Sequence, residues 1–148
     1  MVNQLHIGGN KTMDIEKATQ ELLDIADLIK ELTLKKQKIE NVLEPLRKEY
    51  SEIGYRLYDE VYEILDERGK PKYSNEDRRR LEAEHRLRND KRAIELSREI
   101  RQHRNEIEEI VVEINRLQDR KLILLVAMGA PLPQDVINRE NRGKYIIS

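Results

Sequence analysis

Apolar residues recur between residues 15 and 57 at alternating intervals of three and four. This spacing is typical of a helix that packs along a second helix in a coiled coil. It predicts a first long helix over about residues 13–66, capped by Thr12 and ended by Gly69 and Pro71. The positions of the series, of which only Lys36 is polar, are Ile15, Ala18, Leu22, Ile25, Ile29, Leu32, Lys36, Ile39, Leu43, Leu46, Tyr50, Ile53 and Leu57.

A second series with the same spacing runs toward the C-terminus and predicts a second long helix over about residues 75–128. Ser74 with Asp77 forms a variant of the capping box at its start, and Asn75 is the alternative cap. Gly129 followed by Pro131 is a stop signal at its end. The positions of the second series are Ala93, Leu96, Ile100, His103, Ile107, Ile110, Ile114, Leu117, Lys121, Leu124 and Met128.

Two helices of equal length with a short connection, about residues 67–74, predict an all-α fold: a long antiparallel helical hairpin in which facing residue numbers sum to about 142. Residues 1–12 and 129–148 are predicted to be tails. Pro45 interrupts the first helix, since proline removes a hydrogen bond and clashes with the preceding turn. We expect a kink there, with a break at residues 41–44 as the alternative.

Both helices are apolar over a wider arc at the open end of the hairpin than a two-helix seam can cover. We therefore expect two hairpins to associate into a four-helix bundle, as a homodimer or a higher homo-oligomer. The alternative is that one of the tails folds over this surface. The residues predicted to form the oligomer interface are Leu22, Leu23, Ile25, Ile29, Val111, Ile114, Leu122 and Leu125.

The composition narrows the chemistry that the chain can perform. Of 148 residues, 39% are charged and none is cysteine, which excludes disulfides, thiolate metal sites and cysteine nucleophiles. The three histidines show no ligand spacing and no carboxylate pair stands out, so we expect no metal, no cofactor and no enzymatic activity. The longest apolar run, residues 122–128, is too short to span a membrane, and no secretory signal precedes it, which favours a cytoplasmic location.

Charge is unevenly distributed although the formal net charge is only −1. Residues 68–104 hold 13 Lys and Arg against 7 Asp and Glu, and five of the six tyrosines lie near this tip of the hairpin. Basic and aromatic groups together suit phosphates and bases, so a nucleic-acid-binding accessory is the alternative function. The preferred interpretation is that the tip neutralises the acidic partner helix, residues 50–67, while the tyrosines fill the seam. The candidate contact residues are Arg78, Arg79, Arg80, Arg86, Arg88, Lys91 and Arg92.

The turn sequence Gly69-Lys70-Pro71-Lys72-Tyr73-Ser74-Asn75-Glu76-Asp77-Arg78, followed by Leu87 and Asp90, resembles small coiled-coil proteins of phages and prophages that are encoded near recombination and single-strand-binding genes. In that family the turn reads approximately GKxKYSNEExR. The likeness covers about residues 60–120, and the apolar run 122–128 departs from the more polar ending of the family. The resemblance implies an accessory of phage-type DNA metabolism. Together with the pattern, it predicts a non-enzymatic structural or adaptor protein with an unidentified protein partner.

Overall fold

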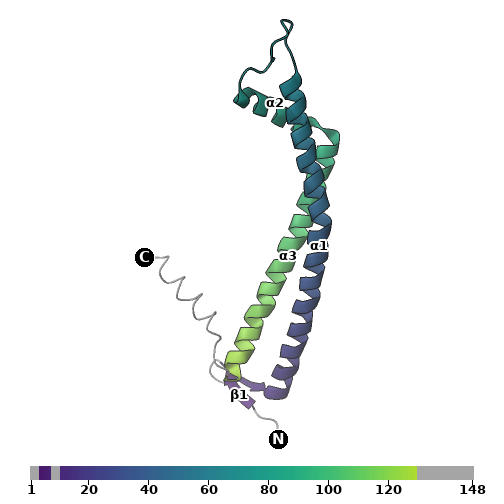
Figure 1. Ribbon diagram of the computed structural model, residues 1–148. Coiled ribbons are helices and arrows are strands. Elements are labelled where there is room, and N and C mark those ends of the chain that lie inside the picture. Colours follow the sequence, from purple (N-terminus) through teal and green to yellow (C-terminus); the bar gives the residue numbers. More distant parts are fainter. Residues whose placement is uncertain (1–3, 8–10, 130–148) are drawn as a thin grey trace, which may run out of the picture. The chain divides into compact units, whose positions relative to one another are not determined.

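The computed structural model describes residues 4–7 and 11–129. Its elements in chain order are β1 (Gln4–Ile7), β2 (Lys11–Asp14), α1 (Ile15–Glu63), α2 (Glu76–Asn89) and α3 (Lys91–Ala127), as Figure 1 shows. Two compact units form: the first joins α1 up to Leu34 with α3 from Ile110, and the second is Lys35–Glu109. The predominance of helix confirms the predicted all-α hairpin fold class, whereas assembly into a bundle stays a prediction.

The N-terminal segment differs from the predicted tail. β1 pairs antiparallel with β2, with Gln4 opposite Asp14 and Ile7 opposite Lys11. Because β2 continues to Asp14, α1 begins two residues later than predicted, and the cap is Asp14 instead of Thr12. Its carboxylate Oδ1 accepts hydrogen bonds from the backbone N–H of Glu16 at 2.9 Å and of Lys17 at 3.4 Å. Residues 1–3 and 8–10 of the predicted tail lie outside the described residues.

The first unit is an antiparallel pair formed by the beginning of α1 and the end of α3. Its core consists of Ala18 and Ile25 from α1 with Leu117 and Leu124 from α3. In this unit Arg120 donates a hydrogen bond from Nε to a carboxylate oxygen of Glu21 at 2.8 Å. Facing residue numbers therefore sum to 141, which confirms the predicted register here.

In the second unit, α1 packs against α2 and against the beginning of α3. The core consists of Ile53, Leu57, Ala93 and Leu96, and Leu46, Tyr50 and Leu87 pack against it. α1 is continuous through Pro45 to Glu63, so the alternative of a break at residues 41–44 is wrong. Every position of the first heptad series is buried or half-buried, and Lys121 is the one exposed position of the second series.

The predicted second helix is divided into α2 and α3, which corrects the single helix over residues 75–128. Asp90 separates them in an extended conformation, with φ −74° and ψ 124°. Its carboxylate accepts a hydrogen bond from the backbone N–H of Ala93 at 2.9 Å, so Asp90 caps α3. The side chain of Asn89 donates to the carbonyl oxygen of His85 at 2.7 Å. Asn and Asp both compete with the helical hydrogen bonds, and the break forms where they are adjacent.

The connection between α1 and α2 spans residues 64–75 and is longer than predicted. Asp66 organises it, because its carboxylate accepts hydrogen bonds from the backbone N–H of Arg68 at 2.8 Å and of Lys70 at 3.0 Å. Gly69 has a φ of 77°, a conformation that glycine adopts without steric cost. At the start of α2, Asn75 accepts from the backbone N–H of Arg78 at 2.8 Å, which confirms Asn75 among the two predicted caps.

Gly129 ends α3 as predicted. Its φ is 78°, and its backbone N–H donates to the carbonyl oxygen of Val126 at 3.0 Å. Pro131 and the apolar segment 145–147 lie outside the described residues.

Candidate functional site

A groove of about 540 Å³, named here the tyrosine groove, lies in the second unit where α1 faces α2. Three aromatic rings dominate its wall, and small side chains leave the space beneath them open. Tyr55 is the most accessible of the three, with 73% of its surface exposed. The lining residues are Tyr50, Ser51, Gly54, Tyr55, Tyr58, Glu76, Arg80, Ala83, Glu84 and Leu87.

A second groove of about 400 Å³, named here the arginine groove, lies between α1 and α3. It combines three guanidinium groups with two serine hydroxyls and one aromatic ring. The lining residues are Arg47, Tyr50, Ser51, Ser97, Ile100, Arg101 and Arg104. Tyr50 and Ser51 line both grooves, so the two adjoin at these residues of the second unit.

The sequence of α1 places the wall of both grooves on one stripe of the helix. Arg47, Tyr50, Gly54 and Tyr58 follow one another at intervals of three, four and four residues, which brings them to the same face. Gly54 contributes by lacking a side chain: a Cβ atom there would lie 4.0 Å from Cδ2 of Leu87, its nearest neighbour. The tyrosine groove is thus a consequence of helical spacing and of a small residue in the centre of the stripe.

The other flank of the same helices carries paired charges. Arg92 bonds Glu49 through Nε at 2.7 Å, and Arg56 lies 3.8 Å from a carboxylate oxygen of Asp90. The hydrogen bond from Arg92 lowers the pKa of the Glu49 carboxyl below its usual value, and the positive charge of Arg92 adds to this effect. A third hollow of about 550 Å³ lies on this flank, and its lining includes Glu52 and Lys91. Basic groups here are largely neutralised within the chain.

The arginine groove lacks this compensation. Among the described residues, no ion pair within 4.0 Å involves Arg47, Arg101 or Arg104. Three positive charges therefore face one groove with their hydrogen-bond donors available to a ligand. Guanidinium groups present a planar fork that matches the oxygens of phosphate or carboxylate.

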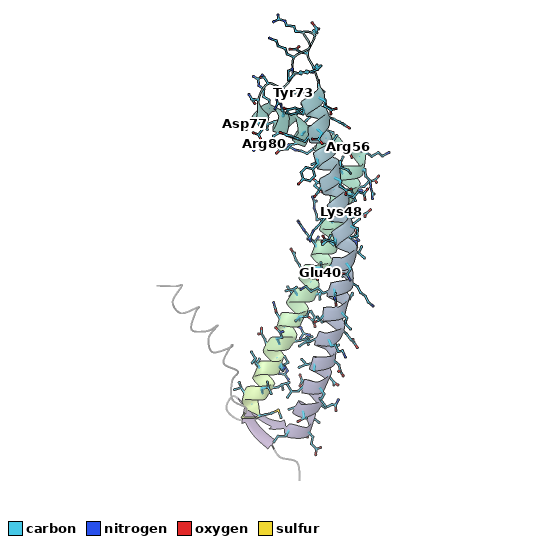
Figure 2. The ribbon with its side chains drawn as sticks, viewed as in Figure 1. Glu40, Lys48, Arg56, Tyr73, Asp77 and Arg80 are labelled. Carbon is cyan, nitrogen blue, oxygen red and sulfur yellow. The ribbon has the colours of Figure 1, made fainter. Side chains whose placement is uncertain are left out.

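Most of the predicted contact residues at the tip are engaged within the chain. Arg86 donates to Glu82 at 3.0 Å, Arg88 lies 3.6 Å from Glu84, and Arg80 lies 3.8 Å from Asp77. Figure 2 labels Arg80 and Asp77 on α2 and Arg56 on α1. These three pairs lie within α2, so α2 satisfies much of its own charge instead of neutralising α1.

The four other members of the predicted tip have different surroundings. The guanidinium group of Arg79 stacks 4.2 Å from the ring centre of Tyr62, and its Nε donates to the carbonyl oxygen of Tyr73 at 2.9 Å. Arg92 is the one predicted tip residue that reaches a carboxylate of α1 in the described chain, that of Glu49. Arg78 is exposed and takes part in no ion pair within the described residues, and the same holds for Lys91.

The predicted interface residues divide into three groups in the first unit. Ile25 belongs to the core of the single chain, and Leu22 and Ile29 pack against that core. Ile114, Leu122 and Leu125 are half-buried, whereas Leu23 and Val111 are exposed. The prediction omitted three exposed apolar residues on the outward side of α3, which are Val112, Ile123 and Val126.

Sequence reasoning missed the arginine groove. It did not single out Arg47, and it counted Arg101 and Arg104 only among the basic residues of the segment 68–104. The predicted register contained the necessary signal, because a sum of 142 places Arg101 opposite residue 41, within two helical turns of Arg47. What the register alone does not give is which of these side chains an ion pair neutralises.

The described residues hold no group of three or more His, Cys, Asp or Glu side chains able to bind a metal ion. His103 occupies a half-buried seam position with its Nδ1 3.9 Å from a carboxylate oxygen of Glu106. Over the same part of the chain, no helix is long and apolar enough to cross a membrane.

Comparisons with models of protein families, with curated proteins and with solved structures give no match.

Proposed function

We propose that this protein is a non-enzymatic helical-hairpin adaptor that associates with a second copy through its first unit. The observation that supports this proposal is the end of α3, residues 122–127, where apolar side chains occupy every face of the helix. Leu124 is completely buried, whereas Ile123 and Val126 are 53% and 54% exposed. A helix that is apolar on all sides is normally buried on all sides, so its outward face requires a cover.

A second copy of the chain can cover this face, because α1 also carries exposed apolar residues in the first unit. Leu23 and Leu28 are exposed there, so both helices of the pair present apolar residues outward. Two such pairs bury these residues against each other in the arrangement of a four-helix bundle, which is the simplest symmetric solution. The two-stranded sheet β1–β2 adds to the argument, since an isolated sheet of this size is marginal in water and gains from further contacts.

The test is the mass of the full-length protein in solution, measured by sedimentation equilibrium from about 1 to 100 μM. We expect the mass of a dimer or a larger oligomer, and a monomer after the double substitution Ile123→Glu and Val126→Glu. The matched control is Val42→Glu in the second unit, where an equally exposed apolar residue is replaced. Far-UV circular dichroism verifies that each variant keeps its helices.

Two results would contradict the proposal. One is a monomer over the whole concentration range. The other is association that appears only when residues 130–148 are removed, because the C-terminal segment would then be the cover of α3.

The adaptor role is supported by the exposed apolar residues on both helices of the first unit, which suit a protein partner. The resemblance of residues 69–78 to phage and prophage coiled-coil proteins supports an accessory role in phage-type DNA metabolism. Nucleic-acid binding at the arginine-rich tip was the alternative function. The ion pairs of Arg80, Arg86, Arg88 and Arg92 disfavour that location, since a ligand would have to compete with carboxylates already in place.

A further inference from the structure

We propose that the tyrosine groove and the arginine groove of the second unit together bind single-stranded nucleic acid. The arginine groove holds the phosphates and the tyrosine groove receives the bases. This binding site lies wholly within the second unit, so the inference does not depend on self-association through the first.

The arginine groove carries positive charge that no ion pair in the described chain neutralises. Arg47, Arg101 and Arg104 line it without a carboxylate partner in the described chain, while Arg92 on the other flank is held by Glu49. Three uncompensated guanidinium groups in a hollow favour a ligand with several negative charges, and a sugar–phosphate backbone supplies one charge per nucleotide. Ser51 and Ser97 add hydroxyl groups that can bond phosphate oxygens.

The two grooves adjoin at residues that line both of them. Tyr50 and Ser51 line both, so a single strand that occupies the arginine groove can extend past them to the rings of Tyr55 and Tyr58. Bases stack on aromatic rings irrespective of sequence, and arginines beside a row of such rings form the usual surface for single strands. A paired duplex cannot present its base faces in this way, which is why the single strand is favoured.

The charges of the tyrosine groove indicate which groove holds the sugar–phosphate backbone and which holds the bases. Glu76 and Glu84 line the tyrosine groove at the side of α2, and Arg80 is the one basic residue there. Carboxylates repel phosphates and are tolerated near base edges. The backbone therefore follows the arginine groove and the bases turn toward the tyrosines.

The experiment uses the full chain and fluorescein-labelled single strands of about 16 nucleotides, oligothymidine and oligouridine, in titrations followed by fluorescence anisotropy at several salt concentrations. We expect the binding constant K of the unchanged protein to fall as the salt concentration rises. The triple substitution of Arg47, Arg101 and Arg104 by Gln should make the slope of log K against log salt less steep by about 2, because each lost phosphate contact removes roughly 0.7 from the slope. The control, in which Arg68, Arg78 and Lys91 are replaced by Gln, removes three exposed positive charges elsewhere and should retain the slope.

Stacking has its own readout. Tyr55→Ala should weaken binding about tenfold at constant salt without changing the slope, because one aromatic platform is lost and no phosphate contact is. Tyr55→Phe keeps the ring and should bind as the unchanged protein does. Since Tyr55 is largely exposed, neither change should affect folding.

Three outcomes would overturn the proposal. The first is that neither strand binds at low salt. The second is that the control triple variant loses binding while the groove variant retains it, and the third is that poly-glutamate binds as tightly as the oligonucleotides and that Tyr55→Ala leaves the affinity unchanged. The second result would locate binding at the tip, and the third would identify an acidic peptide as the occupant. A difference between oligothymidine and oligouridine affinity would show whether DNA or RNA is preferred and leaves the site assigned.

Discussion

Arg92 of α3 donates two hydrogen bonds to the carboxylate of Glu49 on α1, from Nε at 2.7 Å and from a terminal nitrogen at 3.0 Å. The first unit repeats this two-point geometry between Arg120 and Glu21, at 2.8 and 3.2 Å. In both pairs the hydrogen bonds from arginine lower the pKa of the glutamate carboxyl. In the described chain, each unit thus has one bidentate bridge that joins α1 to α3, at the same register of the antiparallel helices.

These bridges predict a stability that depends on pH. A carboxyl whose pKa is lowered by folding stabilises the folded chain above its ordinary pKa, near 4.5, and this contribution disappears as the pH falls through the lowered value. Glu49→Gln should therefore be less stable than the unchanged protein at pH 7, and the difference should be smaller at a pH of about 3, which lies below the ordinary pKa of the carboxyl. Urea denaturation followed by circular dichroism at both pH values measures the difference.

The control for this prediction is Glu52→Gln, which removes an exposed charge of the same helix that takes part in no ion pair within the described chain. Its stability should match that of the unchanged protein at both pH values. An equal deficit of Glu49→Gln at pH 7 and pH 3 would mean that packing of the side chain, and not its charge, is responsible.

The seam of the hairpin was predictable because burial and heptad spacing have the same cause. Ile25 and Leu117 share one core cluster, and Leu46 packs against the cluster that contains Leu96. They do so because a period of 3.5 residues keeps one stripe of each helix against the other. The division at Asp90 was not predictable from this pattern, since the apolar series begins only at Ala93 and says nothing about residues 76–89. There, the local hydrogen bonds of Asn89 and Asp90 decide the backbone.

Core packing in the second unit predicts a large difference between two neighbouring positions of α3. Leu96 is completely buried and Ile94 is 43% exposed. Leu96→Ala should reduce the free energy of unfolding by about 3 kcal/mol, because it removes apolar contacts and leaves a cavity. Ile94→Ala should cost about 1 kcal/mol or less. Equal costs in urea denaturation would mean that Ile94 is also buried, which would indicate a contact on its outward side.

The start of α2 offers a test of a single hydrogen bond. Asn75 accepts from the backbone N–H of Arg78 at 2.8 Å, whereas the neighbouring Ser74 has no capping hydrogen bond in the described chain. Asn75→Ala should lower the free energy of unfolding by about 1 kcal/mol, and Ser74→Ala by less than about 0.5 kcal/mol. If Ser74→Ala were the more destabilising change, the capping box of Ser74 with Asp77 would be the cap in solution.

The candidate site was less predictable than the fold, and the reason is physical. Sequence reveals that Arg80, Arg88 and Arg101 are charged, but whether a charge is available depends on carboxylates within a few ångströms. Arg80 and Arg88 have such partners three or four residues away on their own helix, a relation that spacing does predict. The availability of Arg101 depends on which residues of α1 lie beside it, and therefore on the folded arrangement of the second unit.

Gly54 connects stability with the shape of the tyrosine groove. Glycine in a helix interior is less favourable than alanine by about 1 kcal/mol, and a Cβ atom at this position would make an ordinary contact of 4.0 Å with Leu87. Gly54→Ala should therefore raise the free energy of unfolding by about 0.5 to 1 kcal/mol. Thermal and urea denaturation measure this gain. Gly54→Leu tests the shape of the tyrosine groove, since a longer side chain at this position would fill the space between Tyr50 and Tyr58. A loss of stability in Gly54→Ala would mean that α1 and α2 approach each other more closely than 4.0 Å allows, and that the tyrosine groove is closed in the free protein.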